Sequence, residues 1–497
     1  MDTFITDPPL SLLYAAHECL KNGIAVRIID QRILGDSCYK VIDSAITDDT
    51  LLVGFSVMSG SPILHALQIS KYIKEHYPSI PVVWGGVHVT ICPDSVLDSK
   101  YVDFIQCSVG SYSLYLLARY LYDGNVKLHE IPGLGWLDGD IRNINPYPNH
   151  LSYCRLDEID LSLVNLSDYK RFNYSENVYS LFTSFGCPHK CRFCFSPIIL
   201  KNVKGKHWIP YEAEDVITHI VEIVQKYNIG YISILDDNFF LDISRAKKIL
   251  TGVYEKGVNV RWGIRGVRID DLDKMDEDLL GHLVKVGVEQ MMIGAESGSQ
   301  RVLNMIDKRI SVEQIIRVNR KLSDFKQLIP SYNFLAGIPG ETIEDLYLSV
   351  DLILRLHTEN KNASFSGMNQ FIPFPGSELF NECIKRGYVQ PEKLEEWALI
   401  DTHYNNAKIP WVSPEYENIL HSIQAALMFI DNKADRELSG KNNRKYIIDW
   451  IYSIIILSSR IYRPIAQYRL KNKYFKFSYE YLLIKYAAKI MAKMQKL

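Results

Sequence analysis

The chain has 497 residues, which at about 150 residues per domain predicts roughly three domains. Its net charge of -2 at pH 7 and pI near 6.7 give no overall attraction to nucleic acid. Nine cysteines, most of them scattered, are not the pattern of a small secreted disulfide scaffold, so a reducing cytoplasm fits better. The first residues lack a basic stretch before an apolar core, so no secretory signal is expected.

Residues 8 to about 122 alternate predicted helices with predicted strands. The helices are Ser11–Asn22 and Ile63–Glu75, and the strands are Ala25–Ile29, Leu51–Ser56 and Val82–Trp84. Alternation of this kind predicts an α/β fold with a doubly wound, Rossmann-like parallel sheet. Such sheets bind ligands beyond the carboxyl ends of their strands.

Small residues occupy the loops at those strand ends. They are Ser56, Ser59, Gly60, Gly85, Gly86 and Gly110. Small side chains let a ligand approach the backbone closely, although one glycine after a strand usually marks only a turn. His65 and His88 lie near these loops, and each is expected to pack or to form hydrogen bonds rather than to bind a metal.

Residues 123 to about 176 are rich in turn signals such as Pro132-Gly133 and Asp138-Gly139-Asp140. We interpret this stretch as a linker that contains a small hairpin around Trp136. A linker at this place could shape the entrance for a substrate.

Three cysteines, Cys187, Cys191 and Cys194, follow the apolar run Val178–Phe185 at CxxxCxxC spacing. Structural zinc normally takes four protein ligands, and no nearby fourth cysteine or histidine is convincing, since His189 is expected to face solvent. Iron–sulfur clusters are held by cysteine thiolates, and three ligands on a [4Fe-4S] cube leave one iron open. The spacing therefore favours an iron–sulfur cluster.

With an aromatic residue, Phe193, before the last cysteine, this loop resembles the signature of radical S-adenosylmethionine (SAM) enzymes. The resemblance implies that Cys187, Cys191 and Cys194 hold a [4Fe-4S] cluster whose open iron binds the amine and carboxylate of SAM. In that family one electron cleaves a carbon–sulfur bond of SAM and yields a 5'-deoxyadenosyl radical. An external electron donor of the flavodoxin or ferredoxin type is then also implied.

A second run of strands and helices continues from Val178 to about residue 375. The predicted strands are Val178–Phe185, Tyr231–Leu235, Val258–Ile264, Gln290–Gly294, Ser331–Ala336 and Phe365–Phe371. The predicted helices are Glu212–Tyr227, Ile243–Lys256, Glu277–Val286, Val312–Phe325 and Ile343–Leu356. These six units resemble the partial (β/α)6 barrel of radical SAM enzymes, whose active sites lie at the carboxyl ends of the strands.

Polar residues follow several of these strands. Taken alone, Gly337-Ile338-Pro339-Gly340-Glu341-Thr342 predicts a turn with Glu341 and Thr342 at the start of a helix. By the resemblance, the Ile338 backbone lies against the adenine of SAM, and Glu296 and Ser297 contact its ribose or carboxyl group.

Charged residues at two other strand ends complete the SAM contacts that the resemblance implies. Asp236, Asp237 and Asn238 occupy the position that contacts the methionine ammonium, which a carboxylate suits by charge. Arg268 is expected to bind the SAM carboxylate through two hydrogen bonds, with Arg265 as its competitor and surface solvation as the alternative for both.

The serine and glycine loops, ahead of this motif, resemble the cobalamin-binding domain of the B12-dependent radical SAM enzymes. The resemblance implies that Ser56, Ser59, Gly60, Gly85, Gly86 and Gly110 hold the nucleotide tail of cobalamin. Two features depart from the pattern. Asp30–Gly35 matches an Asp-x-His-x-x-Gly loop only by chance, with Arg32 in place of the cobalt-binding histidine, and Ser108–Ser111 replaces an acidic Gly-Glu-Gly-Glu turn.

Residues 378–497 are predicted to be mostly helical. Tyr446–Leu457 is strongly apolar but only about twelve residues long, well short of the roughly twenty that span a bilayer, so we expect a buried helix. The tail from Arg460 is basic, with Lys485, Lys489 and Lys493 on one helix face. It could contact an anionic membrane, or it could be the solvated face of a helix packed on the barrel.

The predicted domains are a cobalamin-binding domain (1–122), a linker (123–176), a radical SAM barrel (177–377) and a helical region with a basic tail (378–497). The resemblance implies a cytoplasmic radical SAM enzyme, with membrane association as a hypothesis, that uses two SAM molecules to methylate an unactivated carbon through methylcobalamin. The substrate expected is a small or lipid-like molecule. Alternatives are a cyclisation, rearrangement or oxygen insertion, a radical SAM enzyme that has lost cobalamin, and a non-catalytic corrinoid-binding or metal-binding protein.

Overall fold

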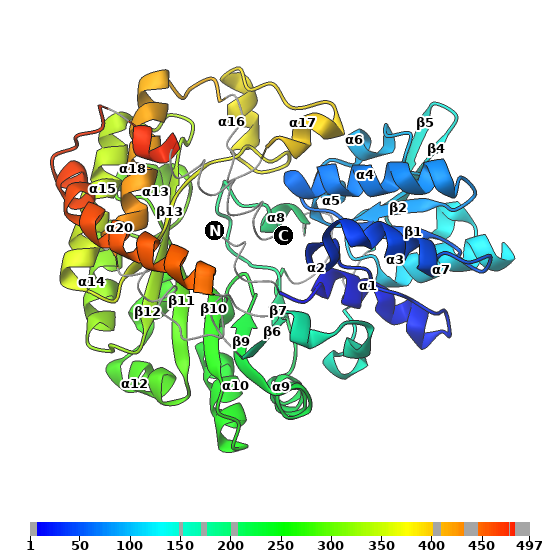
Figure 1. Ribbon diagram of the computed structural model, residues 1–497, viewed down its shortest axis with the longest axis horizontal. Helices are drawn as coiled ribbons and strands as arrows, with labels where there is room; N and C mark the ends of the chain where they lie inside the picture. Colours follow the sequence, from blue (N-terminus) through cyan, green and yellow to red (C-terminus); the bar gives the residue numbers. More distant parts are fainter. Residues whose placement is uncertain are drawn as a thin grey trace.

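The computed structural model describes residues 7–148, 153–169, 176–199, 207–400, 409–431, 446–476 and 478–482, and within 446–456 only the backbone. Two α/β units stand side by side (Figure 1). The amino-terminal unit, blue to cyan, faces a curved sheet, green to yellow, and a segment with two short helices crosses from one to the other.

The amino-terminal sheet has the strand order β1-β2-β3-β4-β5. Its strands are β1 (Val53–Ser56), β2 (Val82–Gly85), β3 (Phe104–Gln106), β4 (Leu134–Asp138) and β5 (Ile141–Ile144). The first three are parallel, and β4 and β5 form an antiparallel hairpin whose turn uses Gly139 at φ +59°. The hairpin predicted around Trp136 is confirmed, and it extends the sheet beyond residue 122.

The predicted strand Ala25–Ile29 is wrong, because residues 22–30 form no regular element. A strand needs a ladder partner, and β1 is the edge of the described sheet, with its pairing bonds directed to β2. The apolar run at this place instead forms a loop between α1 and the next helix.

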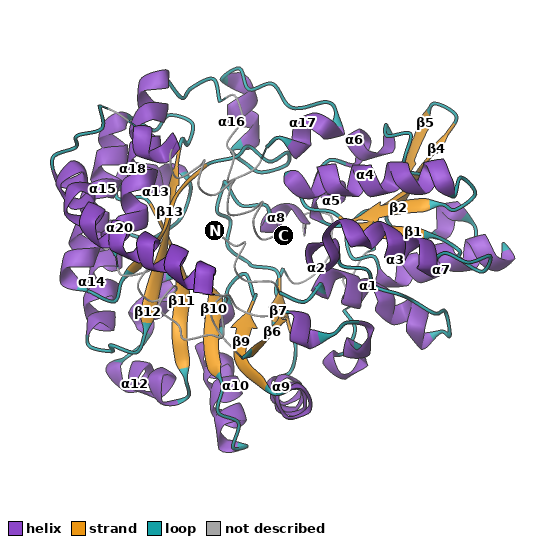
Figure 2. Cartoon of the chain, viewed as in Figure 1, coloured by secondary structure: helices purple, strands orange, loops and turns teal. Residues whose placement is uncertain are grey.

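Helices cover both faces of this sheet (Figure 2). They are α1 (Leu10–Lys21), α2 (Gln31–Leu34), α3 (Cys38–Ala45), α4 (Ser61–His76), α5 (Val87–Ile91), α6 (Pro93–Leu97) and α7 (Ser111–Asp123). On one side α1 packs against α7, while α4 lies on the other side and contacts a helix of the carboxyl-terminal region. The doubly wound arrangement expected from the alternating pattern is therefore present.

The second sheet has six parallel strands in chain order. They are β6 (Asn177–Leu181), β9 (Ile229–Ile234), β10 (Arg261–Val267), β11 (Val288–Glu296), β12 (Ile329–Ala336) and β13 (Ser364–Gln370). The connecting helices are α9 (Ala213–Tyr227), α10 (Ile243–Glu255), α11 (Ile269–Lys274), α12 (Glu277–Lys285), α13 (Gln300–Met305), α14 (Val312–Ser323) and α15 (Ile343–Glu359). The six predicted strands and the partial (β/α)6 barrel are confirmed.

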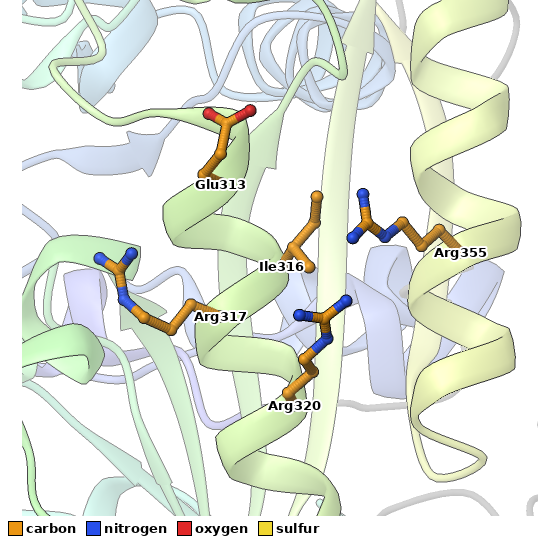
Figure 3. A pocket seen from close by; sticks show the side chains of 5 residues that line it. All are labelled: Glu313, Ile316, Arg317, Arg320 and Arg355. Carbon is orange, nitrogen blue, oxygen red and sulfur yellow. The ribbon is translucent and has the colours of Figure 1, made fainter.

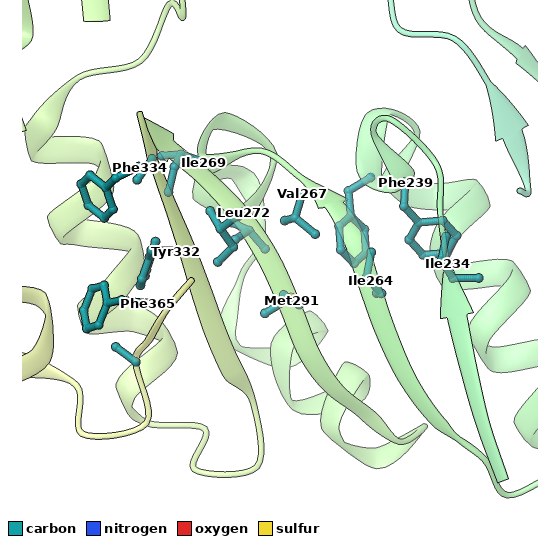
Figure 4. Packing of buried hydrophobic residues seen from close by; sticks show 14 of the residues in the cluster. Ile234, Phe239, Ile264, Val267, Ile269, Leu272, Met291, Tyr332, Phe334 and Phe365 are labelled. Carbon is teal, nitrogen blue, oxygen red and sulfur yellow. The ribbon is translucent and has the colours of Figure 1, made fainter. Parts of the chain in front are cut away.

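The barrel is held by apolar side chains between its sheet and its helices. Ile264, Met291 and Tyr332 project from neighbouring strands, and Leu272 of α11 packs beside them (Figure 4). These side chains are almost completely buried. Strands of a parallel sheet are covered on both faces, which is why their sequences read as nearly continuous apolar runs.

The carboxyl-terminal region contains α16 (Phe380–Lys385), α17 (Leu394–Ala398), α18 (Pro414–Ile430) and α20 (Tyr446–Lys471). Its helix α17 packs on α4 of the amino-terminal unit, and α18 packs on β13 and α20.

The helix predicted at Tyr446–Leu457 is present and longer than expected, since α20 runs on to Lys471. Leu457, the one residue of the predicted stretch whose side chain is described, is 59% exposed, so the expected burial does not hold at that position. Among the described residues, no helix is long and apolar enough to cross a membrane. The lysines predicted to share a helix face at 485–493 lie outside the described residues.

Candidate active site

The three cysteines lie in the loop between β7 (Ser184–Phe185) and α8 (Ser196–Ile199), next to the short strand β8 (Ile209–Pro210). Two nitrogen donors point at their sulfurs. The Ser196 amide lies 3.4 Å from Cys194 Sγ, and Arg268 Nη1 lies 3.6 Å from Cys191 Sγ. Hydrogen bonds to sulfur are one of the means by which proteins tune iron–sulfur clusters, so the loop suits such a group.

Burial raises the pKa of the Cys187 thiol to about 11 and that of Cys194 to about 12. As free thiols they would therefore be protonated at neutral pH, and iron would have to displace those protons. Across the described ranges, no three His, Cys, Asp or Glu side chains converge on a point that would hold a single metal ion. A [4Fe-4S] cube differs from such a site because its three cysteine ligands would bind three separate irons, one thiolate each.

His189 was expected to face solvent, but it is only partly exposed and its Nε2 atom is buried without a hydrogen-bond partner among the described residues. Burial and the nearby Arg268 lower its pKa.

Of the two arginines considered for the SAM carboxylate, Arg268 lies beside the cysteines. It is 6% exposed, donates to Asp270 at 2.9 Å and to the Lys308 carbonyl at 3.0 Å, and reaches Cys191. Arg265 instead forms an ion pair of 2.7 Å with Asp7 of the amino-terminal unit. The contact of Arg268 with SAM stays a prediction, and Arg265 belongs to the junction between the two units.

The three polar residues after β9 point in different directions. Asp236 is buried and accepts three hydrogen bonds of 2.6 Å, from the Thr183 amide, the Thr183 hydroxyl and the Ser184 hydroxyl. Asn238 donates to Asp271 at 2.8 Å and is also buried. Both side chains therefore tie this strand end to neighbouring elements.

Asp237 is the exposed member of the three, and its carboxylate accepts one bond of 2.6 Å from Ser196 beside the cysteine loop. Loss of hydration in the surrounding protein raises its pKa. A bound cation would favour the ionised form. Asp237 is thus the carboxylate that remains open to a ligand.

A buried ion pair joins Glu296, at the end of β11, to Lys308. The two charges lie 2.6 Å apart, and both side chains are less than 10% exposed. Gly294 makes room for them, because a Cβ there would lie 2.6 Å from Lys308 Nζ. The Lys308 ammonium also lies 5.8 Å from the centre of the Phe193 ring in the cysteine loop.

Lys308 could not be predicted from the sequence, because it lies in an irregular loop after α13 and belongs to no recognisable motif. Its neighbours Asp307 and Arg309 and its partner Glu296 all have positive φ, at +50°, +59° and +65°. Non-glycine residues seldom adopt this conformation, and when they do they often lie at functional sites.

Ser297 and the loop after β12 are held mainly by other parts of the protein. The Ser297 hydroxyl is fully buried and lies 3.2 Å from that of Ser349 on α15. Thr342 caps α15 as predicted, through Asp345, but Glu341 does not sit on the helix end. Its carboxylate accepts from the Gly337 and Ile338 amides at 2.6 and 3.1 Å, because the loop folds around it.

At the amino-terminal unit, the predicted cofactor loops lie at the ends of β1, β2 and β3. Ser56 is exposed, and Gly60 and Gly86 have φ of +96° and +102°. A Cβ on Gly86 would lie 2.7 Å from the Val57 carbonyl oxygen, and one on Gly110 would lie 2.7 Å from Gln106. Glycine is therefore required at Gly86 both for its conformation and for the close approach of two backbones.

His88 forms a hydrogen bond of 2.9 Å with Ser59, which confirms the bonding role expected for it. The ring is fully buried, and burial lowers its pKa to about 4, so it is neutral at pH 7. Its Nε2 atom has no partner among the described residues, and its ring packs edge-on against Trp397 of α17 at 5.6 Å. His65 is exposed on α4.

In the segment Asp30–Gly35, which matches the cobalt-binding motif only by chance, Arg32 forms an ion pair of 2.6 Å with Asp30. At the replaced acidic turn, the buried Ser108 hydroxyl has no partner among the described residues. An open Ser56, glycine-lined loops and unpartnered polar atoms at His88 and Ser108 suit a bulky ligand with hydrogen-bonding groups. The cobalamin tail fits this description.

An aromatic group that we did not predict joins the two units beside the cysteine loop. Tyr153 stacks on Phe185 at 3.5 Å, and Tyr14 of α1 meets the same ring edge-on at 5.7 Å. Phe185 is two residues before Cys187. Burial, and in second place the nearby charge of Asp237, raise the pKa of Tyr153, so the group borders the open carboxylate.

A groove of about 330 Å³ lies elsewhere, between α14 and α15 (Figure 3). Its lining residues are Glu313, Ile316, Arg317, Arg320 and Arg355. Arg320 and Arg355 both bind Glu359, and Arg317 binds Asp273, so these cations are already neutralised. The groove contains none of the predicted site residues.

Two family models match the chain in the order that the fold suggests. The model described as "B12 binding domain" matches residues 7–114, and that described as "Radical SAM superfamily" matches residues 181–353. The chain is therefore a radical SAM protein with an amino-terminal B12-binding domain. This class uses a [4Fe-4S] cluster, SAM and cobalamin, and the donor sets described above fit all three.

Named relatives carry different activities. A cytidylyl-2-hydroxyethylphosphonate methyltransferase of Streptomyces wedmorensis is 26% identical over 78% of this chain and 79% of its own length. An anaerobic magnesium-protoporphyrin IX monomethyl ester cyclase of Rubrivivax gelatinosus is 24% identical over 64% of this chain and 55% of its own.

Among solved structures, the cobalamin-dependent radical SAM enzyme OxsB, with aqua-cobalamin and SAM bound, aligns with a TM-score of 0.70. The alignment covers 98% of this chain and 73% of that one at 17% identity. At this identity the likeness establishes the fold alone.

Proposed function

We propose that this enzyme transfers a methyl group from SAM to an unactivated carbon of a small-molecule substrate. The observation that carries the proposal is the junction of two cofactor sites in one chain. Helix α5, which follows Gly86 in the B12-binding domain, contacts α8, which follows the cysteine loop. Tyr14 of α1 and Tyr153 both pack on Phe185 just before the cysteines, and Arg265 binds Asp7 across the same boundary. A relative with the name of a methyltransferase supports the same choice.

When bound, the cluster would supply the electron that cleaves SAM, and cobalamin would carry the methyl group. Cys187, Cys191 and Cys194 would hold the cluster. The Asp237 carboxylate is suited by charge and exposure to the methionine ammonium, and Arg268 beside Cys191 to the methionine carboxylate. The Ile338 backbone would lie against the adenine.

The chain's own residues would also limit access of water to this place. Phe185, Tyr153 and Tyr14 form a continuous aromatic wall next to Asp237. Exclusion of water strengthens electrostatic contacts and protects reactive intermediates. Radical SAM enzymes generally need an external electron donor, and we propose one of the flavodoxin or ferredoxin type.

The runner-up is a radical reaction without methyl transfer, such as a cyclisation, rearrangement or oxygen insertion. The named cyclase relative is the observation in its favour. The two candidates share the cluster and SAM contacts, so no residue described above separates them.

The test is anaerobic reconstitution with iron, sulfide and hydroxocobalamin, followed by reduction with SAM and chromatography of the products. Methyl transfer predicts both 5'-deoxyadenosine and S-adenosylhomocysteine, and neither from the Cys187→Ala, Cys191→Ala and Cys194→Ala variants. Formation of 5'-deoxyadenosine without S-adenosylhomocysteine would favour the runner-up. Absence of both products from the reconstituted wild type would contradict radical SAM catalysis.

We also propose that the carboxyl-terminal region contacts an anionic membrane surface, which would suit a lipid-like substrate. Leu457, Ile461, Ile465 and Tyr468 are each at least half exposed and recur along one face of α20. Between residues 457 and 482 the sequence has six Lys or Arg residues and one acidic residue, Glu480. An apolar helix face bordered by basic residues is typical of interfacial helices.

Co-sedimentation with vesicles tests this contact. Ile461→Glu and Ile465→Glu should move the protein from phosphatidylglycerol vesicles to the supernatant, while Leu348→Glu, at an exposed apolar position on α15, should not. Deletion of 474–497 should weaken binding further. Equal sedimentation of all variants, or no binding by the wild type, would contradict the membrane contact.

A further inference from the structure

The loop Gly337–Thr342, which follows β12, is held by side chains from outside the barrel. The Gly337 amide donates to the Tyr416 hydroxyl at 2.8 Å, and the Gly337 carbonyl accepts from the Trp411 indole at 2.9 Å. Tyr416 belongs to α18, and Trp411 lies three residues before the start of that helix at Pro414. The carboxyl-terminal region thus binds both backbone groups of one loop residue.

Glu341 makes a second connection to the same helix. Its Oε2 atom accepts from the Tyr416 hydroxyl at 2.8 Å as well as from the Gly337 and Ile338 amides. Its Oε1 atom is buried and has no hydrogen-bond partner among the described residues. A buried carboxyl group with one unsatisfied oxygen is costly, so the three bonds to the other oxygen must hold it in place.

The loop itself has little to fix its conformation. Gly337 and Gly340 have φ of +76° and +85°, which glycine adopts freely, along with many other conformations. Two glycines in four residues make a loop that depends on its contacts. Ile338 between them is completely buried, so the position of its backbone follows from how Gly337 is held.

We propose that Tyr416 and Trp411 are positioning residues for SAM binding, which act by fixing the loop that carries Ile338. The inference rests on the proposed function, because that proposal places the adenine of SAM against Ile338. The radical SAM match ends at residue 353, so these two residues lie outside it. The carboxyl-terminal region is thereby a working part of the SAM site as well as a cover for the barrel.

Tyr416→Phe removes the hydroxyl, which both donates and accepts, and keeps the ring. Trp411→Phe removes the indole N–H donor and leaves a smaller aromatic ring. A matched control is Tyr388→Phe, because the buried Tyr388 hydroxyl has no hydrogen-bond partner among the described residues. SAM affinity is measured by equilibrium dialysis on cluster-reconstituted protein without substrate, and thermal unfolding is followed in parallel. Loss of the hydrogen bonds that order the loop, two in Tyr416→Phe and one in Trp411→Phe, should weaken SAM binding by at least about tenfold in each test variant. Tyr388→Phe should bind as the wild type does.

The pH dependence of SAM affinity distinguishes the proposed role from a purely structural one, because a general loss of stability would not shift the pH at which the affinity changes. Burial raises the pKa of Glu341 to about 7, with Asp345 of α15 adding to the rise, while the Tyr416 hydroxyl and the loop amides lower it. The ionised carboxylate is the stronger acceptor for the loop amides, so SAM affinity should increase as pH rises through that value. In Tyr416→Phe the inflection should move to higher pH.

Wild-type SAM affinity in both variants, or a lower melting temperature with unchanged SAM affinity, would overturn the proposal. Since substrate is absent, a failure of methyl transfer would leave these results unaffected. If the wild type itself bound no SAM, both the proposed function and this inference would fall.

Discussion

The two cofactor regions of this protein are built from different chemistry. At the barrel mouth the side chains are charged and mostly paired, as with Glu296 and Lys308 or Arg268 and Asp270. At the ends of β1, β2 and β3 the residues are small and uncharged, and His88 is neutral because burial lowers its pKa to about 4. The barrel mouth thus presents charged side chains, and the ends of β1, β2 and β3 present small residues that leave space for a ligand.

The difference follows from the ligands that the two regions would receive. SAM has an ammonium, a carboxylate and a sulfonium centre, so its site needs fixed charges of both signs. A cobalamin tail is large, so its site needs glycines that let two backbones approach, as Gly86 and Val57 do.

Lys308→Met should produce the largest loss of stability. It leaves the Glu296 carboxylate buried without its partner, which typically costs about 3–5 kcal/mol. Adding Glu296→Gln should restore much of the loss, and a double-mutant cycle in urea measures the coupling. As a control, Lys274→Met removes a pair with Asp271 whose lysine is 64% exposed, and it should change stability by less than about 1 kcal/mol. Equal losses of stability in Lys308→Met and Lys274→Met would contradict the burial of the pair between Lys308 and Glu296.

Acid should destabilise both the amino-terminal unit and the barrel through one buried histidine each, His88 beside Ser59 and His219 beside Tyr179. Burial lowers each pKa to about 4, below the unfolded value near 6.5, so the unfolded chain binds more protons between those pH values. The contribution of each neutral histidine to the free energy of unfolding is fully present above pH 6.5. It falls by about 3 kcal/mol as the pH decreases toward 4.

Melting temperature measured from pH 7 to pH 4.5 checks this dependence. His88→Gln and His219→Gln should each flatten the curve, and an exposed control, His65→Gln, should not. A wild-type curve that stays level over this range would contradict the inferred burial of both rings.

Asp236→Asn and Asp237→Asn should affect different properties, stability and SAM binding respectively, although the residues are adjacent. Asp236 accepts three hydrogen bonds in the interior, so its replacement should lower the free energy of unfolding by about 2 kcal/mol. Asp237 is exposed, so its replacement should leave stability within about 0.5 kcal/mol and weaken SAM binding about tenfold. Urea denaturation and equilibrium dialysis give the two values, and a reversed pattern would reassign the carboxylate that faces the ligand.

Gly86→Ala should weaken cobalamin binding and leave the cleavage of SAM unchanged. Its φ of +102° and the 2.7 Å approach to the Val57 carbonyl predict strain of about 1–2 kcal/mol. Cobalamin retained after gel filtration should fall, while cleavage of SAM persists. Gly124→Ala, at φ +65° with nothing within 4 Å of the added carbon, is the control for conformation without crowding. Unchanged cobalamin content in Gly86→Ala would remove this loop from the site.

Much of this arrangement could be predicted from the sequence, because its signals are local. The spacing of Cys187, Cys191 and Cys194 fixes the chemistry, and apolar runs predict all six barrel strands. The strand expected at Ala25–Ile29 failed, since an apolar run gives no information about whether a ladder partner is present.

The site was harder to predict in detail. Asp236, Asp237 and Asn238 are all polar residues in the sequence. Only the Asp237 carboxylate remains available to a ligand, because Asp236 is bonded to Thr183 and Asn238 to Asp271. Lys308 meets Glu296, and Tyr416 meets Gly337, only once distant segments fold together. Contacts of this kind leave no periodic trace in the sequence.

The most direct test of the central claim, that both cofactor regions act on one methyl group, uses SAM with a trideuterated methyl group. Reconstituted wild-type protein would be reduced anaerobically with this SAM, and the bound corrinoid would be extracted for mass spectrometry. Our account predicts that the corrinoid gains the mass of the labelled methyl group. An unlabelled corrinoid from protein that still forms 5'-deoxyadenosine would contradict it.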